Sequence, residues 1–249
     1  MQTLIRGKYL FTDFRAKQKG ILQDSALCVQ DGVIKEIGSF PALKEKYPQA
    51  TVLGTGREFV LPGFIDAHTH GHGLSHIQRG VPFDFLENSL LDWAYAPDLP
   101  PELNAQLTAA RHLLQGCTML HHNEMGQPQD NLEKLLPKSH AYLQGYLKSG
   151  MRIAYSPGIR NINFLASEDE AFYYTLPSAL QERIKPLVFF DRKQVEENYF
   201  TWFQEIYQQY QQERIAIFMG PNWAHGATDE LLQKAHAISQ SYDGLPMHI

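Results

Sequence analysis

The segment Leu61-Pro-Gly-Phe-Ile-Asp-Ala-His68-Thr-His70 decides the fold. It is an apolar run, typical of a buried strand, that ends in two histidines separated by one residue. Successive side chains of a strand point to opposite faces, so His68 and His70 share one face. At the carboxyl end of a parallel strand, two such imidazoles can reach a single metal ion.

The chain after this segment alternates apolar runs with amphipathic stretches, which is the pattern of βα units around a parallel sheet. We expect strands at 64–67, 118–121, 152–156, 215–219 and 245–249. We expect helices between them, at 101–115, 131–149, 192–212 and 229–241. The pattern predicts βα units over residues 60–249, with five strands in a parallel sheet. An open doubly wound sheet is the alternative.

Residues 1–59 have a different pattern, with short apolar strands separated by turns. Asp31–Gly32, between two alternating runs, predicts a hairpin. We expect this part to be a small β-rich unit that precedes the βα region. The stretch 161–190 interrupts the βα pattern and is expected to be a long connection, either a binding loop or a packed insertion.

A third histidine, His248, ends the fifth expected strand. Closure of a barrel brings the end of that strand towards the end of the first. Alone, such a histidine is more often structural than a ligand. Together with His68 and His70 it makes three imidazoles, a set that suits Zn²⁺ and is also compatible with Fe²⁺.

Several segments together resemble the amidohydrolase superfamily. They are Gln30–Gly38, Val60–His70, Leu114–Thr118, Ser149–Ile153 and Gly244–His248, which span nearly the whole chain. Within the superfamily, the chain is most similar to the branch of cytosine deaminase, guanine deaminase and the triazine hydrolases.

The resemblance implies a (β/α)8 TIM-type barrel over residues 60–249, of which only about five strands are present, preceded by a portion of a small β-sandwich over residues 1–59. It also implies a metal-dependent hydrolase in which one divalent ion activates a water molecule. The water attacks a C–N or related bond of a small molecule, and a heterocycle deaminase is the first reaction to expect. His68, His70 and His248 would be the ligands. The segment 215–220 lacks the lysine of dinuclear relatives, which favours a single ion. A ring-opening amidase or imidazolonepropionase-like hydrolase stays open, as does a non-catalytic barrel scaffold.

Five further residues are candidates for substrate binding, because each follows or ends an expected strand. They are His72, His121, Arg160, Asn222 and His225. Relatives often carry a histidine where this chain has Asn222. Either His121 or His122 must face the barrel interior, because neighbouring strand residues alternate.

The resemblance implies further catalytic groups that this chain does not contain. A glutamate three residues after the strand-five histidine, a strand-six histidine and a strand-eight aspartate would all follow Ile249. We therefore expect an N-terminal fragment that is inactive alone, with no catalytic residue beyond the metal ligands.

Composition excludes several other classes of protein. The chain has 249 residues, a net charge of −5 and scattered basic residues, so nucleic acid is not an expected partner. We found no signal peptide or membrane-spanning apolar run, which predicts a cytoplasmic protein. Cys28 and Cys117 lack the spacing of a metal site. A homodimer is the default expectation.

Overall fold

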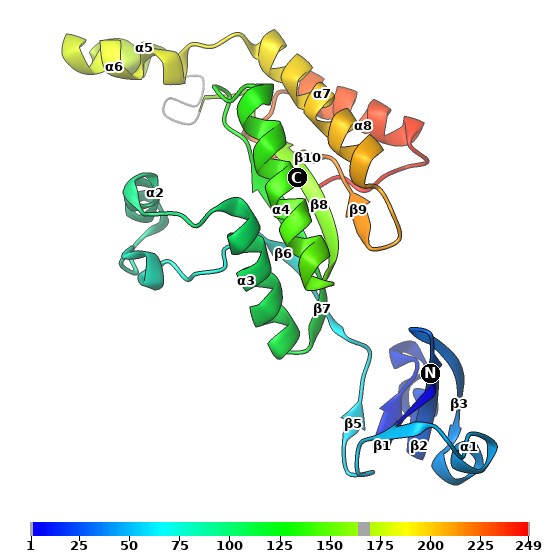
Figure 1. Ribbon diagram of the computed structural model, residues 1–249. Helices are drawn as coiled ribbons and strands as arrows, with labels where there is room; N and C mark the ends of the chain where they lie inside the picture. The colour runs from blue at the N-terminus through cyan, green and yellow to red at the C-terminus, as the bar shows by residue number, and fades with distance from the viewer. Residues whose placement is uncertain (1, 164–169, 249) are drawn as a thin grey trace. The chain divides into compact units, whose positions relative to one another are not determined.

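The computed structural model describes residues 2–163 and 170–248. Its contacts divide the chain into two compact units, Met1–Gly63 and Phe64–Ile249 (Figure 1). The larger unit contains all the candidate site residues. The assignment of 1–59 to a sandwich domain and 60–249 to a barrel domain stays a prediction.

The smaller unit is a five-stranded sheet in which β1 (Gln2–Phe11) is central. It pairs antiparallel with β2 (Ile21–Gln30) and parallel with β4 (Thr51–Leu53) and β5 (Phe59–Val60). The predicted hairpin joins β2 to β3 (Val33–Ser39), and both turn residues have positive φ, 53° at Asp31 and 77° at Gly32. A 3-10 segment (Phe14–Gly20) and α1 (Phe40–Lys46) complete the unit.

The larger unit is built around a parallel sheet in the order β10-β8-β7-β6. The strands are β6 (Phe64–Thr69), β7 (Cys117–Met125), β8 (Arg152–Ile159) and β10 (Gly220–Pro221), with β9 (Ile215–Ile217) also paired to β8. All these pairings are parallel. The predicted parallel βα order is thus confirmed for four of the five expected strand regions.

The fifth expected strand, 245–249, is reduced to a single parallel bridge between Met219 and Met247. Two backbone hydrogen bonds support it, from the Met219 N–H to the Pro246 carbonyl (3.3 Å) and from the His248 N–H to the Met219 carbonyl (2.8 Å). The predicted strand 245–249 is therefore longer than the pairing that the described residues form. Its direction and its neighbour agree with the expectation.

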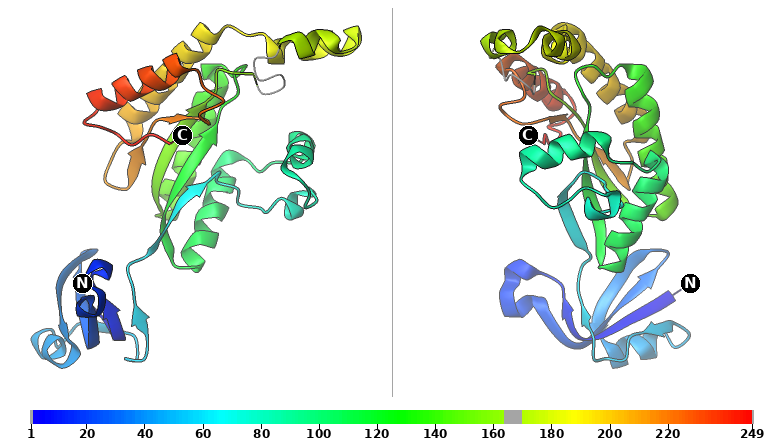
Figure 2. Two further views of the ribbon diagram at one scale, coloured as in Figure 1. Left: turned by 180° about the vertical axis from the view of Figure 1, so that it is seen from behind. Right: turned by 90° about the vertical axis from the view of Figure 1, so that its left-hand side faces the viewer.

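Four helices cover one face of this sheet (Figures 1 and 2). They are α3 (Pro101–Leu114), α4 (Leu132–Ser149), α7 (Arg192–Tyr210) and α8 (Asp229–Ser241), close to the predicted ranges. Asn131, Asp191 and Thr228 cap the last three by accepting hydrogen bonds from backbone N–H groups. The core between helices and sheet includes Tyr146, Tyr155 and Trp202, all fully buried.

Three further helices and one short 3-10 turn were not anticipated. The 3-10 turn Ile77–Arg79 and α2 (Leu86–Tyr95) follow the histidine pair. In the long connection, α5 (Glu170–Thr175) and α6 (Ser178–Val188) pack on each other through Tyr173 and Val188. Part of that connection, 164–169, lies outside the described residues.

The packing of α4 on the sheet gives a direct test of this core. Leu143 is fully buried, so Leu143→Ala should lower the free energy of unfolding by about 2–5 kcal/mol through lost burial and a residual cavity. Leu114→Ala is the matched control, because that side chain is 83% exposed, and its effect should stay within about 0.5 kcal/mol. Urea denaturation measures both, and equal effects would contradict this packing.

Candidate metal and substrate site

Four histidines meet at the carboxyl ends of the parallel strands, and we call them the histidine group: His68, His70, His121 and His248. The ring centroid of His68 lies 5.0 Å from that of His70 and 4.9 Å from that of His248. The ring of His121, from β7, lies 5.1 Å from that of His248. The structure therefore brings together the three predicted ligands, 180 residues apart in sequence, and one predicted substrate-binding residue.

His70 is held by a hydrogen bond to the neighbouring strand. Its Nδ1 lies 3.0 Å from the backbone carbonyl oxygen of Asn123. A carbonyl oxygen only accepts, so Nδ1 carries the proton and donates. The lone pair of a neutral imidazole is then on Nε2, the arrangement in which a histidine is oriented to bind a metal ion.

His68 and His248 contact each other directly. Nδ1 of His68 and Nε2 of His248 are 2.8 Å apart and share a hydrogen bond. Burial, followed by the neighbouring imidazoles of His121 and His68, lowers the pKa of His248 to about 4. Its other nitrogen, Nδ1, is buried and has no hydrogen-bond partner among the described residues. His248 is therefore a neutral imidazole with one unsatisfied buried nitrogen.

The side chains of these histidines are suitable ligands for a divalent cation, but their present positions are not those of a formed metal site. Three neutral imidazoles are a donor set that binds zinc or iron, and the unsatisfied Nδ1 of His248 shows a polar group that lacks a partner. Yet within 2–163 and 170–248, no three His, Cys, Asp or Glu side chains are arranged to hold an ion as they stand. Two nitrogens on one tetrahedral zinc lie roughly 3.3 Å apart. If Nδ1 of His68 and Nε2 of His248, now 2.8 Å apart, are the ligating atoms, they must give up their mutual hydrogen bond to bind the ion.

His121 is the inward-facing member of the pair that the sequence left open. Its Nε2 lies 2.8 Å from Ser156 Oγ on β8, and its Nδ1 lies 3.3 Å from the Ala67 carbonyl oxygen. Burial lowers its pKa. His122 points to the helix side, where it is 1% exposed and its Nδ1 lies 3.0 Å from the Tyr146 hydroxyl. Strand alternation alone separates the two.

Asp66 supports His68 through the backbone. Asp66 lies two residues before His68 on β6, so the two side chains share a strand face. One carboxylate oxygen accepts a hydrogen bond from the His68 N–H (3.1 Å), and the other lies 2.9 Å from Nε2 of His112 on α3. The carboxylate thus ties the end of β6 to α3 and does not contact the His68 ring through these bonds.

His72 lies in the loop after the histidine pair. Its ring centroid is 6.4 Å from that of His70 and 5.7 Å from that of His76, and His76 in turn packs on Trp93 of α2 at 4.4 Å. A cavity of about 380 Å³ adjoins these rings. Its lining consists of His72, Leu74, Ser75, His76, Thr108, Arg111 and His112.

Arg160, Asn222 and His225 form a second group, at the ends of β8 and β10. Arg160 is only 9% exposed, donates to Gln127 Oε1 (2.5 Å) and places its guanidinium 5.8 Å from the Trp223 ring centroid. The ring of His225 stacks on the same Trp223 at 5.4 Å. Asn222 is buried against Gly158, and its N–H donates to the Ile159 carbonyl (2.7 Å). These three candidates are neighbours of each other.

Two residues that position the site were not predicted. Asn123 acts through its backbone carbonyl, which carries no sequence signal. Ser156 bonds to His121 from the adjacent strand, at a register that becomes evident only when β7 and β8 are paired.

Curated relatives include several hydrolases. The chain is 26% identical over 239 residues to 5-methylthioadenosine/S-adenosylhomocysteine deaminase of Nitratidesulfovibrio vulgaris (strain Miyazaki F), which covers 92% of the chain and 44% of the relative. It is 38% identical over 69 residues to the same-named protein of Thermodesulfovibrio yellowstonii, covering 27% and 15%. Imidazolonepropionase of Pyrobaculum arsenaticum is 31% identical over 72 residues, covering 27% and 18%. No family profile matches.

These relatives place the similarity of the chain with the amidohydrolase superfamily, as the sequence predicted. The fold agrees: a triazine hydrolase of Arthrobacter aurescens superimposes with a TM-score of 0.70 at 18% identity, over 97% of this chain and 51% of that one. A zinc-bound adenosine deaminase of Xanthomonas campestris gives 0.63 at 18%, over 99% and 48%. The predicted similarity and the barrel fold are thus confirmed. The chain spans less than half the length of the curated relatives described above.

The buried His122 predicts how stability depends on pH. Burial keeps this imidazole neutral in the folded protein by lowering its pKa well below the ordinary value. The ordinary pKa of a histidine is about 6.5, so in the unfolded chain His122 takes up a proton as the pH falls through that value. Below that pH the unfolded state binds more protons than the folded state does. The contribution of His122 to the free energy of unfolding is therefore complete above about pH 6.5 and is lost on acidification, by up to about 1.4 kcal/mol per pH unit.

In urea titrations between pH 7 and pH 5, His122→Gln should therefore show a shallower decline of unfolding free energy than the unsubstituted protein. His236→Gln, at an exposed position on α8, is the control and should retain the steep decline. Parallel curves for His122→Gln and the unsubstituted protein would exclude a buried neutral imidazole at this position.

Proposed function

We propose that this chain is the metal-binding part of a hydrolase that cleaves a C–N bond of a small molecule, with heterocycle deamination as its reaction. The observation that carries the proposal is the convergence of His68, His70 and His248 at the carboxyl ends of the parallel strands. In barrel folds this end carries the active site.

The residues have distinct roles in this proposal. His68, His70 and His248 hold one divalent ion, zinc by first expectation and Fe²⁺ as the alternative. When bound, the ion supplies the Lewis acidity that activates water for hydrolysis. The Asn123 carbonyl keeps the Nε2 lone pair of His70 available. His121, held by Ser156, lies beside this site and is ready to hydrogen-bond a substrate.

The remaining candidates would contact the substrate away from the reacting bond. His72 adjoins the 380 Å³ cavity beside His70. Arg160, Asn222 and His225 would form a second contact region, in which the guanidinium and the amide recognise polar or anionic groups. The names of the relatives support deamination of a heterocycle, because they include deaminases of adenosine-type compounds.

A ring-opening hydrolase is the second candidate, favoured by the similarity to imidazolonepropionase. Both reactions use the same ligand histidines, so the product distinguishes them: ammonia for a deaminase and a ring-opened acid for the alternative. A non-catalytic scaffold is the third candidate, and the retention of all three histidines disfavours it. The predicted homodimer and cytoplasmic location remain predictions. No helix in the described part of the chain is long and apolar enough to cross a membrane.

Metal content tests the proposal. Elemental analysis of the purified protein should find about one equivalent of zinc or iron, as expected for a single three-histidine site. The double variant His68→Ala/His70→Ala should lose it, because one imidazole cannot retain the ion. His225→Ala/His236→Ala is the matched control, since it removes two exposed histidines, and it should keep the metal.

Ammonia release from a panel of heterocyclic amines then tests the reaction, measured on a metal-loaded protein of the relatives' full length that contains this chain. Metal that persists in the double variant would refute the ligand assignment. A folded protein that binds no zinc or iron would favour the third candidate, a non-catalytic scaffold.

A further inference from the structure

The three residues after His70 are Gly71, His72 and Gly73, and they lie along α3. Side chains of α3 hydrogen-bond to the backbone of the two glycines. The Thr108 hydroxyl oxygen lies 2.8 Å from the Gly71 carbonyl oxygen and 2.8 Å from the Asn104 carbonyl oxygen, and these two acceptors share its single proton. The Asn104 side-chain oxygen accepts from the Gly73 N–H (2.6 Å), and Arg111 Nη1 donates to the Gly73 carbonyl (2.7 Å). We call these three residues, Asn104, Thr108 and Arg111, the α3 clamp.

The spacing of the clamp follows from helix geometry. Residues 104, 108 and 111 are separated by four and then three positions, so they lie on one face of α3. Asn104 and Thr108 are 2% and 1% exposed. Buried polar side chains of this kind are costly unless they are bonded, and here their partners are the loop backbone and, for Asn104 Nδ2, the Tyr142 hydroxyl (3.2 Å). The clamp is thus a built contact.

The opposite side of the loop is closed by His122. Gly71 has a φ of +66°, and a Cβ there would lie 2.4 Å from Cε1 of the His122 ring. Only glycine fits this approach. His122 is itself fixed by the Tyr146 hydroxyl and lies 3.6 Å from the Glu124 carboxylate. The loop therefore has contacts on both sides immediately after His70.

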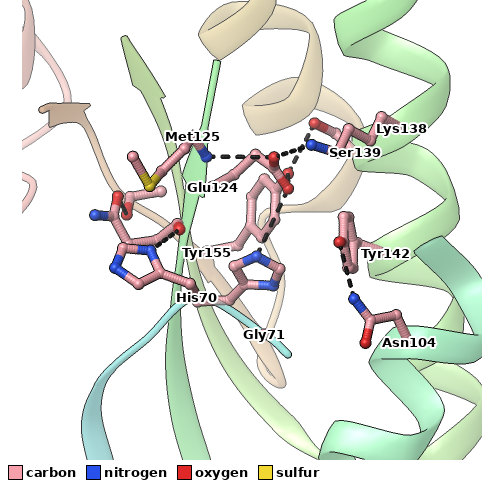
Figure 3. A network of polar contacts seen from close by, with 12 residues as sticks. His70, Gly71, Asn104, Glu124, Met125, Lys138, Ser139, Tyr142 and Tyr155 are labelled. Carbon is pink, nitrogen blue, oxygen red and sulfur yellow. Dashed lines mark hydrogen bonds and ion pairs between the residues drawn. The ribbon is translucent and has the colours of Figure 1, made fainter. Parts of the chain in front are cut away.

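Glu124 is supported by a larger network on the helix side of β7 (Figure 3). Its carboxylate accepts from Lys138 Nζ at 2.7 Å, and Tyr155 bonds to Ser139 at 2.8 Å. Figure 3 shows His70 on one side of β7 and Lys138 with Tyr142 on the other. Gly71 links the two sides, because it directly follows His70 in the chain and lies against the ring of His122 on the helix side.

From this arrangement we propose that the α3 clamp, and Thr108 above all, is a positioning device that sets the metal affinity of His70. The inference rests on the proposed function. The Asn123 carbonyl fixes the tautomer of His70, whereas the clamp fixes the backbone that follows it. Without the clamp, Gly71 is free to rotate, and the His70 imidazole loses its place relative to His68 and His248. None of the three clamp residues contacts the ion itself.

The test is the Zn²⁺ dissociation constant of the full chain, measured by competition with a chelator, together with the melting temperature. Thr108→Val keeps the shape and removes the hydroxyl, so Zn²⁺ binding should weaken by about tenfold, the effect typical of groups that orient ligands. Thr108→Ser restores the hydroxyl and should bind within about threefold of the unsubstituted protein. Arg111→Met, at an exposed position where folding is spared, should weaken binding by about threefold.

Tyr210→Phe is the matched control for general destabilisation. Tyr210 is a buried residue of α7 whose hydroxyl lies 3.0 Å from His140 Nδ1 and 3.4 Å from Gln144 Nε2 on α4, and neither bond involves the loop after His70. It should lower the melting temperature as Thr108→Val does and leave Zn²⁺ affinity unchanged. Equal weakening by Tyr210→Phe and Thr108→Val would overturn the proposal, because the effect would then be loss of stability alone.

Two further outcomes separate this inference from the proposed function. If His68→Ala/His70→Ala abolishes Zn²⁺ binding while Thr108→Val and Arg111→Met bind as the unsubstituted protein does, the metal site stands and the clamp proposal falls. If the unsubstituted protein binds no Zn²⁺, the proposed function falls and the inference with it.

Discussion

Parallel pairing of β6, β7 and β8 is the constraint on which the candidate site depends. In a parallel sheet all carboxyl ends lie at one edge, so the residues that follow each strand meet there although they are far apart in sequence. The pairing of Thr69 with His122 and of Asn123 with Ser156 sets which side chains meet. His70 then reaches the Asn123 carbonyl, and His121 reaches Ser156. A shift of one residue in this register would turn His121 towards the helices.

Alternation along β7 gives its two faces different tasks. His121 faces the histidine group, while His122 and Glu124 face the helices in a buried polar layer with Lys138 and Tyr146. Burying the Glu124 carboxylate costs free energy because it loses water. The hydrogen bond from Lys138 and the other hydrogen bonds of this layer offset that cost. Because His122 abuts Gly71, this layer also bears on the loop that follows His70. The site is thus supported from behind the sheet.

Much of the architecture was predictable because it rests on local patterns. The strands β6, β7 and β8 and the helices α3, α4, α7 and α8 followed from apolar runs, cap residues and C-terminal glycines, each of which acts within a few residues. The helix α2 was missed, since it lies between Pro82 and Pro97 and has Phe85 at its N-cap, a residue with no side chain that could cap a helix. The segment 245–249 was expected as a whole strand, but strand pairing is a non-local contact, and here it amounts to one bridge at Met247.

The sequence by itself determined the parallel βα order, and strand alternation placed His68 and His70 on one face. Only the tertiary structure decided that His121 rather than His122 joins them, that Asn123 orients His70 through its carbonyl, and that Arg160 is buried beside Trp223. It also decided that His68 and His248 bond to each other. Each of these facts depends on strand register and helix packing, which bring together residues with no local relation in the chain.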